Sequence, residues 1–348
     1  MMDRMLTQLG PAGAAPVDDG GMQAQALAML GREDRVAAIW AAGKIETCGT
    51  PHGGVETEPL DEIVRRARDA QVVIVNEAHD RPEGRAFIGA IAAALRPLGF
   101  AIYAAEAFSP SVGRTGPAYA LESDGGYVNE PAFGELVRRV RALGYALVPY
   151  EDRRRSPPDP MAAMNAREAG EVDNLMSRIF AVDPHARVLI HVGYSHAREL
   201  PDNGVTWMAA RLKARTGIDP LTIDQTTFGP AGERARVCVA SSDGTALDAT
   251  FDLSVMPPAP RFVGGRAKWR QDLGQRLVAI PAALLRPGQR LLVEARRADE
   301  PPTATAVDRI LVDPGETLPL LLPPGRFRVR ARMVKGAWSP SLPIEVLP

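Results

Sequence analysis

The chain has 348 residues, a length that predicts two domains at roughly 100–200 residues per domain. Hydrophobic residues make up 45% of the chain, which is enough for a sizeable core, and 41 basic residues against 42 acidic ones give a formal net charge of -1. This balance argues against binding to nucleic acid or to an anionic membrane through bulk electrostatics. Two cysteines are too few for a disulfide framework or a four-cysteine zinc site, and none of the five histidines lies beyond residue 196.

The N-terminal part of the chain carries no recognisable targeting segment. Residues 1–20 are rich in glycine, proline and alanine and are predicted to be disordered, residues 22–40 show interrupted helical spacing, and residues 45–54 are predicted to form a loop. No apolar stretch resembles a secretory signal or reaches the roughly 20 residues of a membrane span. We therefore predict a cytoplasmic protein without a membrane span, or a periplasmic one if the start codon is misassigned.

Helix and strand patterns alternate from about residue 59 onward. The β-branched run at residues 72–75 is typical of a buried parallel strand. Further strands are predicted at residues 100–105, 145–149, 187–192 and 220–224, and helices at 60–67, 83–95, 133–143, 165–180 and 205–214. This alternation predicts a three-layer α/β domain at residues 21–227, in which helices cover both faces of a mostly parallel sheet.

The pattern changes after about residue 228, where helical periodicity mostly disappears and prolines become frequent. Residues 326–333 alternate between arginines on one face and apolar side chains on the other, which is typical of a half-buried antiparallel strand. Weaker strand patterns lie at residues 237–240, 250–255, 291–295, 310–312 and 318–322. We predict a smaller all-β sandwich at residues 228–348, similar to an immunoglobulin or fibronectin-III module, with a structural role or a protein partner.

Acid–base side chains follow the predicted strands, at the edge where parallel sheets bind ligands. They are Glu77 and His79 after the first strand, Glu106 after the second, Glu151 and Asp152 after the third, and His191 and His196 near the end of the fourth. Each also has a structural interpretation, because loop residues can be solvated and a strand histidine can be hydrogen-bonded within the core. Glu77 and His79 are two residues apart and point the same way in an extended chain. Convergence from four strands favours a functional site.

The predicted helix at residues 165–180 adds Arg167 and Glu168. Asn165 and Glu168 fit a capping box, in which Asn165 is the N-cap and Glu168 reaches back to it. Glu168 also shares a helical face with the apolar Val172 and Leu175, which places it on the inward stripe. Arg167 can pair with a carboxylate or hold a substrate anion. The structural and the functional interpretation of this pair both stay open.

Four motifs together resemble a known superfamily. They are Asn76-Glu77-Ala78-His79, Ala105-Glu106, Asn165-Ala-Arg-Glu168 and His191-Val-Gly-Tyr-Ser-His196. Their order and placement resemble the superfamily of erythromycin esterases, ChaN-type haem-binding proteins and Tiki/TraB-type proteases, over about residues 55–225. The matching positions are Glu77, His79, Glu106, Arg167, Glu168, Gly193 and His196. Asn76 departs from the glycine that usually opens the first motif.

The resemblance implies a site but not one reaction, and the leading hypothesis is hydrolysis of an ester or amide bond in a small-molecule or peptide substrate. His79 would be the general base or a metal ligand, oriented by Glu77, with Glu106 as second carboxylate or ligand, His196 as ligand or electrophile, and Arg167 and Glu168 positioning the substrate. Metal-dependent members imply a divalent ion such as Mn, Zn or Co, with His79, Glu106, His191 and His196 as its ligands.

Two alternatives stand beside hydrolysis. One is haem or iron binding without catalysis, with Tyr194 and His196 as ligands, and the other is a binding scaffold with a vestigial site. No P-loop and no Gly-x-Gly-x-x-Gly follows the first strand, which argues against nucleotide binding. Gly193-Tyr-Ser-His-Ala197 partly resembles a nucleophile elbow, but no histidine follows residue 196 to serve as its base. Cys48 with His52 is a weaker thiol candidate outside the strand-end set.

Overall fold

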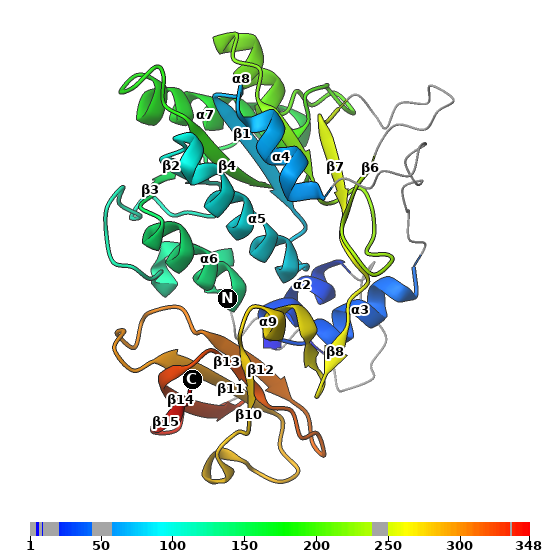
Figure 1. Cartoon of the computed structure of the whole chain (residues 1–348), viewed down its shortest axis with the longest axis vertical. Coiled ribbons are helices and arrows are strands. Elements are labelled where there is room, and N and C mark those ends of the chain that lie inside the picture. The colour runs from blue at the N-terminus through cyan, green and yellow to red at the C-terminus, as the bar shows by residue number, and fades with distance from the viewer. Residues whose placement is uncertain (1–4, 7–8, 10–20, 44–57, 239–249, 335) are drawn as a thin grey trace.

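The computed structural model describes residues 5–6, 9, 21–43, 58–238, 250–334 and 336–348 (Figure 1). The predictions for residues 1–20 lie largely outside the described residues, and those for residues 45–54, with Cys48 and His52, lie wholly outside them. Within these ranges, no helix is both long and apolar enough to cross a membrane.

A seven-stranded sheet with the order β3-β2-β4-β1-β5-β7-β6 forms the centre of the larger part of the molecule. Its strands are β1 (Val72–Glu77), β2 (Ile102–Ala105), β3 (Ala146–Pro149), β4 (Val188–Gly193), β5 (Leu221–Asp224), β6 (Arg236–Cys238) and β7 (Leu253–Met256). Neighbouring strands pair in parallel, except that β6 is antiparallel to β7. Every residue of β1 and β4 is buried, which explains the continuous β-branched run in β1.

Helices cover both faces of this sheet. One face packs on three helices, α4 (Pro59–Ala67), α5 (Pro82–Leu95) and α6 (Pro131–Ala142), which form a core with Val73 and Val75 of β1. The other face packs on two helices, α7 (Pro160–Leu175) and α8 (Met208–Thr216), which form a core with Val72 and Ile74. A π-helical turn, Met176–Phe180, extends α7, and 3-10 turns lie at Arg96–Leu98, Glu122–Asp124, Tyr127–Asn129 and Tyr194–Ala197. The predicted three-layer α/β domain is confirmed.

Helix α7 begins at Pro160, earlier than the sequence analysis predicted. Its N-cap is Asp159, whose Oδ1 accepts a hydrogen bond from the main-chain N–H of Ala162 at 2.7 Å. Aspartate followed by proline is a strong signal for a helix start, because aspartate caps the first turn and proline has no N–H that would need a partner there. The prediction of Asn165 as N-cap is therefore wrong. Asn165 instead accepts a hydrogen bond from the N–H of Thr206 and holds the loop before α8.

The second part of the molecule, here called the β domain, is antiparallel. Its four-stranded sheet has the order β12-β11-β14-β15, and the pairs β10-β13 and β8-β9 accompany it. Its elements are β8 (Phe262–Val263), β9 (Arg266–Ala267), α9 (Lys268–Asp272), β10 (Arg276–Val278), the 3-10 turn Ala282–Leu284, β11 (Leu291–Arg297), β12 (Asp308–Val312), β13 (Leu320–Leu322), β14 (Gly325–Met333) and β15 (Leu342–Val346). Val293, Leu320 and Phe327 share a core between the four-stranded sheet and β13. The predicted all-β domain after the α/β domain is confirmed.

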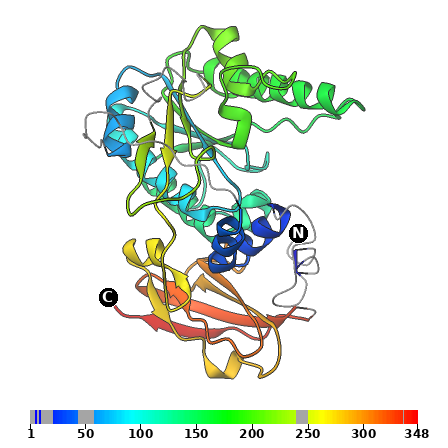
Figure 2. The ribbon, with the colours of Figure 1, turned by 90° about the vertical axis from the view of Figure 1, so that its right-hand side faces the viewer.

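The N-terminal helices α2 (Gly21–Met29) and α3 (Glu33–Ala41) pack on the β domain (Figures 1 and 2). Leu27 and Leu30 share a core with Leu292 of β11 and Leu311 of β12. In addition, β6 and β7 lie beyond residue 228 but belong to the seven-stranded sheet. The chain therefore passes between its two parts more often than a single boundary between residues 227 and 228 implies.

Gly31, between α2 and α3, is a point of close approach to the β domain. Its φ is +73°, and a Cβ there would lie 1.9 Å from the main-chain oxygen of Arg309. We expect Gly31→Ala to lower the free energy of unfolding by about 2 kcal/mol or more. The strain of an alanine in the left-handed backbone conformation adds to its steric clash with the main chain of Arg309. Gly288 has a φ of +74° and nothing within 4 Å of its Cβ position, so Gly288→Ala reports the strain alone. Equal losses for the two variants in urea denaturation would contradict the close approach.

Candidate functional site

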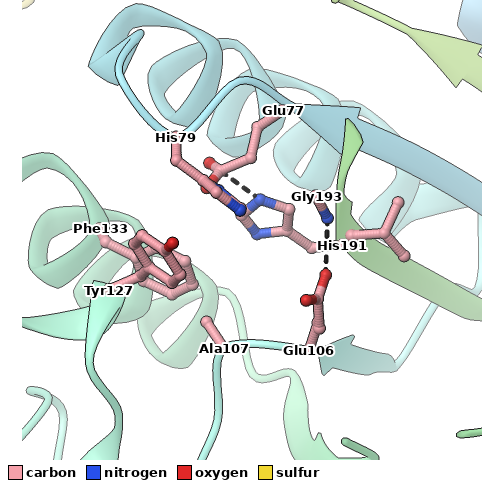
Figure 3. A pocket seen from close by; sticks show the side chains of 9 residues that line it. Glu77, His79, Glu106, Ala107, Tyr127, Phe133, His191 and Gly193 are labelled. Atoms are coloured by element: carbon pink, nitrogen blue, oxygen red, sulfur yellow. Dashed lines mark hydrogen bonds and ion pairs between the residues drawn. The ribbon is translucent and has the colours of Figure 1, made fainter. Parts of the chain in front are cut away.

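The carboxyl ends of β1, β2 and β4 bring three chain segments together at one pocket (Figure 3). Glu77 ends β1 opposite Gly193, which ends β4, and Glu106 directly follows β2. The lining residues are Glu77, His79, Glu106, Ala107, Tyr127, Phe133, His191, Val192 and Gly193. The pocket has a volume of about 230 Å³ including its open mouth, and its enclosed part has room for about one water molecule.

Glu77 is held by a buried arginine. Arg85 of α5, with 0% of its surface exposed, donates from Nε to Glu77 Oε2 at 2.7 Å and from Nη2 to Oε1 at 2.8 Å. Its Nη1 donates to Glu130 Oε2 at 2.8 Å, and Glu130 also caps α6 by accepting from the N–H of Phe133. Burial alone would raise the pKa of Glu77, but Arg85 and His191 outweigh it and hold that pKa well below its usual range. Glu77 is therefore ionised.

His191 has both ring nitrogens occupied. Nε2 lies 3.0 Å from Glu77 Oε2, and Nδ1 lies 2.6 Å from the hydroxyl of Tyr103. Since Glu77 is ionised and can only accept, Nε2 carries a proton and donates it to Glu77, and Nδ1 is hydrogen-bonded to the hydroxyl of Tyr103. The ring also stacks on Phe133. Coordination of a metal by His191, as the sequence analysis predicted, would require one of these bonds to break.

His79 turns one ring nitrogen toward Glu77 and the other toward the pocket. Nδ1 lies 3.3 Å from Glu77 Oε1, and the ring stacks on Tyr127 with 4.1 Å between centroids. A Cβ on Gly193 would lie 2.9 Å from His79 Nε2 and 3.4 Å from Glu106 Oε2. His79 and Glu106 thus both lie against Gly193 (Figure 3), and any larger residue at this position would displace the imidazole.

Tyr194 adopts a left-handed backbone conformation, with a φ of 38°. Its main-chain oxygen accepts from Asn76 Nδ2 at 2.8 Å, and its hydroxyl accepts from the N–H of His79 at 3.3 Å. Asn76 also donates to Asp224 and accepts from the N–H of Gln225, each at 2.7 Å. Asn76 therefore ties β1 to β5 and holds Tyr194 in place.

Glu106 is oriented by two donors. Its Oε2 accepts from the N–H of Gly193 at 2.7 Å, and its Oε1 accepts from Arg167 Nη2 at 2.6 Å. Arg167 also donates from Nε and Nη2 to both oxygens of Glu151, at 2.8 and 2.6 Å. Burial would raise the pKa of Glu106, but His196 and Arg167 outweigh it and lower that pKa. Glu106 is therefore also ionised.

His196 connects Arg167 to the buried carboxyl groups of α7. Nδ1 lies 2.8 Å from Glu168 Oε1 and 3.6 Å from Glu171 Oε2, and Nε2 lies 2.8 Å from Arg167 Nη1. Glu168 also accepts from the N–H of Met208 at 2.8 Å, so it fixes the start of α8 rather than its own helix. The capping-box interpretation of Glu168 is therefore wrong, and its position on the inward stripe is confirmed.

Two influences compete for the protonation of His196. Burial lowers its pKa, but the hydrogen bond with Glu168 and the charges of Glu106 and Glu171 raise it to about 9. The contact with Arg167 requires an unprotonated Nε2, because arginine only donates. Removing Arg167 would therefore take away the contact that opposes protonation of Nε2.

A divalent cation would fit one group of side chains. Among the residues that the structure describes, Glu168, Glu171 and His196 offer ligand atoms within 4.8 Å of one another. Glu171 is fully buried and neither of its oxygens has a hydrogen-bond partner, although Arg167 Nη2 lies 3.2 Å from Oε1. Burial raises the pKa of Glu171 well above its usual value. This group shares only His196 with the predicted metal ligands His79, Glu106, His191 and His196.

Haem does not fit the pocket at the strand ends. The predicted ligand His196 has Glu168 on one ring nitrogen and Arg167 on the other, and carboxylates surround it. Tyr194 packs edge-on against His79. An apolar cavity large enough for a macrocycle is what haem requires, and this pocket is narrow and ionic.

The six predicted catalytic residues lie at this edge of the sheet in two hydrogen-bonded groups, Glu77 with His79 and Glu106 with Arg167, Glu168 and His196, while their catalytic roles stay predictions. The sequence analysis missed Arg85, Tyr103, Tyr127, Glu130 and Glu171. Two of these carried a local signal: Glu130 directly precedes Pro131, as an N-cap does, and Glu171 lies one helical turn beyond Arg167. The others carried none.

No protein-family model and no curated protein matches the chain. Among solved structures, the type III effector HopBA1 is 17% identical, and the match covers 61% of this chain and 97% of that one with a TM-score of 0.36. A structure described as bacterial protein toxins is 11% identical over 58% of this chain and 39% of that one, with a TM-score of 0.37. RRSP, a MARTX toxin effector domain from Vibrio vulnificus CMCP6, is 14% identical over 57% and 38%, with a TM-score of 0.35. Likenesses this low assign no activity.

The link between Arg167 and His196 gives a titration test. We expect Arg167→Met to raise the pKa of His196 by about one unit or more, because a neighbouring positive charge disfavours a second one. Histidine ring signals followed by NMR from pH 5 to 10 would measure this, with His196→Gln to assign the signal. Arg154→Met, which removes a 65% exposed arginine paired with Asp152, should leave the titration unchanged. A pKa that falls or stays constant in Arg167→Met would contradict the contact.

Proposed function

We propose that this chain hydrolyses an ester or amide bond, with a water molecule activated by His79. The observation that carries the proposal is the placement of the His79 ring. Nδ1 faces the ionised Glu77, whereas the opposite edge of the ring lies against Gly193 and lines the pocket together with Glu106. An imidazole whose tautomer is set by a carboxylate and whose free nitrogen faces a water-sized space is suited to be a general base.

In the proposed step, the water oxygen attacks the substrate carbonyl carbon and its proton passes to His79 Nε2. Glu77 accepts from Nδ1–H and stabilises the imidazolium that forms. Glu77 does not take this proton, because Arg85 and His191 hold its pKa well below its usual range, against the effect of burial. His79 then returns the proton to the leaving alcohol or amine as the tetrahedral intermediate collapses.

Glu106 and Arg167 have the positions to orient the water and to stabilise charge. The ionised Glu106 can accept the second hydrogen bond of the attacking water. Arg167 lies next to it and can stabilise the oxyanion of the intermediate, which is often the largest contribution in acyl transfer. The resemblance of the motifs to the superfamily of erythromycin esterases, ChaN-type proteins and Tiki/TraB-type proteases supports this role, and membership in it is part of the proposal.

The proposal is tested by removing the base while keeping the shape of the site. We expect His79→Gln to lower hydrolysis of p-nitrophenyl esters or coumarin amides about 10²- to 10⁴-fold, the usual contribution of general acid–base catalysis. Glu77→Gln should have a smaller effect in the same direction, because it loses the orienting charge. Initial rates over a substrate panel measure both.

The matched control is His185→Gln, which changes an exposed histidine in a turn between α7 and β4. This variant should keep the full rate. If a substrate is found and His79→Gln hydrolyses it as fast as the unchanged chain does, His79 is not the base and the proposal is wrong.

A metal-assisted hydrolase is the second candidate, and the buried carboxyl group of Glu171, whose oxygens make no hydrogen bond, favours it. Glu168, Glu171 and His196 would hold the cation, and a bound cation would supply Lewis-acid activation of water or substrate. The acidic surroundings of Arg167 fit this role, since four carboxyl groups lie around one guanidinium. They are Glu106, Glu151, Glu168 and Glu171.

Direct binding separates this candidate from the metal-free one. If a cation binds at this group, Glu171→Gln should weaken binding of Mn²⁺ or Zn²⁺ at least about tenfold, since it removes one anionic ligand. Equilibrium dialysis with elemental analysis measures the binding without reference to activity. Glu151→Gln changes a carboxylate that pairs with Arg167 outside the group and should bind nearly as well. Equal binding by the unchanged chain and Glu171→Gln would contradict this candidate.

A further inference from the structure

The β domain contacts the segment that carries two residues of the proposed site. We propose that it positions the site: Thr305 and Arg309 hold the main chain at Val128 and Asn129, and so fix Tyr127 over His79 and Glu130 on Arg85. The effect on catalysis rests on the proposed function, whereas the positioning itself does not. Thr305 and Arg309 are positioning residues, since neither lines the pocket.

The contacts fall on consecutive residues of the segment. Thr305 Oγ1 donates to the main-chain oxygen of Val128 at 3.2 Å, and Arg309 Nη1 donates to that of Asn129 at 2.9 Å. Thr305 and Arg309 are 0% and 1% exposed, so these bonds have no competition from water. The residues on either side, Tyr127 and Glu130, are the ones that reach the site.

Further contacts anchor the same segment from residue 120 onward. The N–H of Thr305 donates to the oxygen of Ala120 at 2.8 Å, and the N–H of Glu122 donates to the oxygen of Thr303 at 2.9 Å. Leu121 and Ala304 form an isolated antiparallel bridge. The backbone of the β domain thus pairs with residues 120–122. Main-chain hydrogen bonds, and not only side-chain packing, therefore fix the position of this segment.

Helix α6, which follows the segment, is fixed on the same side. Arg138 donates from Nε and Nη2 to the two oxygens of Glu300, at 2.8 and 2.6 Å, and from Nη2 to the oxygen of Thr305 at 2.7 Å. A Cβ on Gly134 would lie 2.6 Å from Thr305 Cγ2, so α6 approaches the β domain closely. Glu130 caps this helix, so its carboxyl group is positioned by α6 as well as by the segment.

The consequence for the site follows from what Tyr127 and Glu130 do. Tyr127 stacks on the His79 ring, and its hydroxyl donates to Gln25 of α2, which itself packs on the β domain. Glu130 pairs with Arg85, the residue that holds Glu77. Loosening the β-domain contacts should therefore let the His79 ring and the Glu77 carboxylate drift from the geometry that general-base catalysis needs.

Two substitutions in the full chain test the proposal. Thr305→Val keeps the shape and removes one hydrogen bond, and Arg309→Met removes the other. In histidine-labelled protein, Tyr127→Leu gives the NMR position of the His79 ring signals without the stacked ring. We expect both variants to move these signals toward that position, and to lower kcat about tenfold with little change in KM on any substrate that the chain hydrolyses.

Val329→Ala is the matched control, because it destabilises the β-domain core at a residue that makes none of these contacts. It should leave the His79 signals and kcat unchanged. The proposal is overturned if Thr305→Val is folded and keeps the His79 signals of the unchanged chain, or if Val329→Ala shifts them as much. The NMR result stands even if no hydrolysis is found, so failure of the proposed function and failure of the positioning are distinguishable. Thr305→Val decides the question if Arg309→Met does not fold.

Discussion

The buried ion network of Glu77, Arg85 and Glu130 is the interaction on which the rest of the site depends. A guanidinium with no exposed surface is stable only when carboxylates surround it, and removing one partner of such a pair typically costs about 3–5 kcal/mol. Here the two carboxylates come from different elements, the end of β1 and the start of α6. The network therefore fixes a strand end against a helix start, and it keeps Glu77 ionised beside both His191 and His79.

The order of the elements and the strand-end residues could be predicted because both depend on local patterns. The run at residues 72–75 marks a central parallel strand, and residues after such strands gather at one edge whatever their loops do. The start of α7 was misjudged because Asn165 and Glu168 match a capping box by spacing alone, while Asp159 before Pro160 is the better cap. Arg309 and Asn129 are 180 residues apart, and no periodicity in the sequence reports such a contact.

The electrostatics of the site divide it into two halves that meet at Gly193. On one side Arg85 pairs with both Glu77 and Glu130. On the other side a single arginine, Arg167, faces four carboxyl groups, and the buried oxygens of Glu171 make no hydrogen bond. The first half is a rigid support for His79. The second half has more carboxyl groups than cationic ones, which favours binding of a proton or a cation, so ligand binding should have its largest electrostatic effect there.

The packing of α2 and α3 on the β domain sets an order of events during synthesis. Leu27 and Leu30 leave the ribosome long before their core partners Leu292 and Leu311 are synthesised. All strands of the parallel sheet are complete by residue 256, so this sheet can form while the two N-terminal helices still lack their core partners. The two N-terminal helices and the β domain then pack together after the parallel sheet has formed. A nascent chain that stops short of residue 292 would expose the apolar faces of both helices, which is a form that chaperones and proteases recognise.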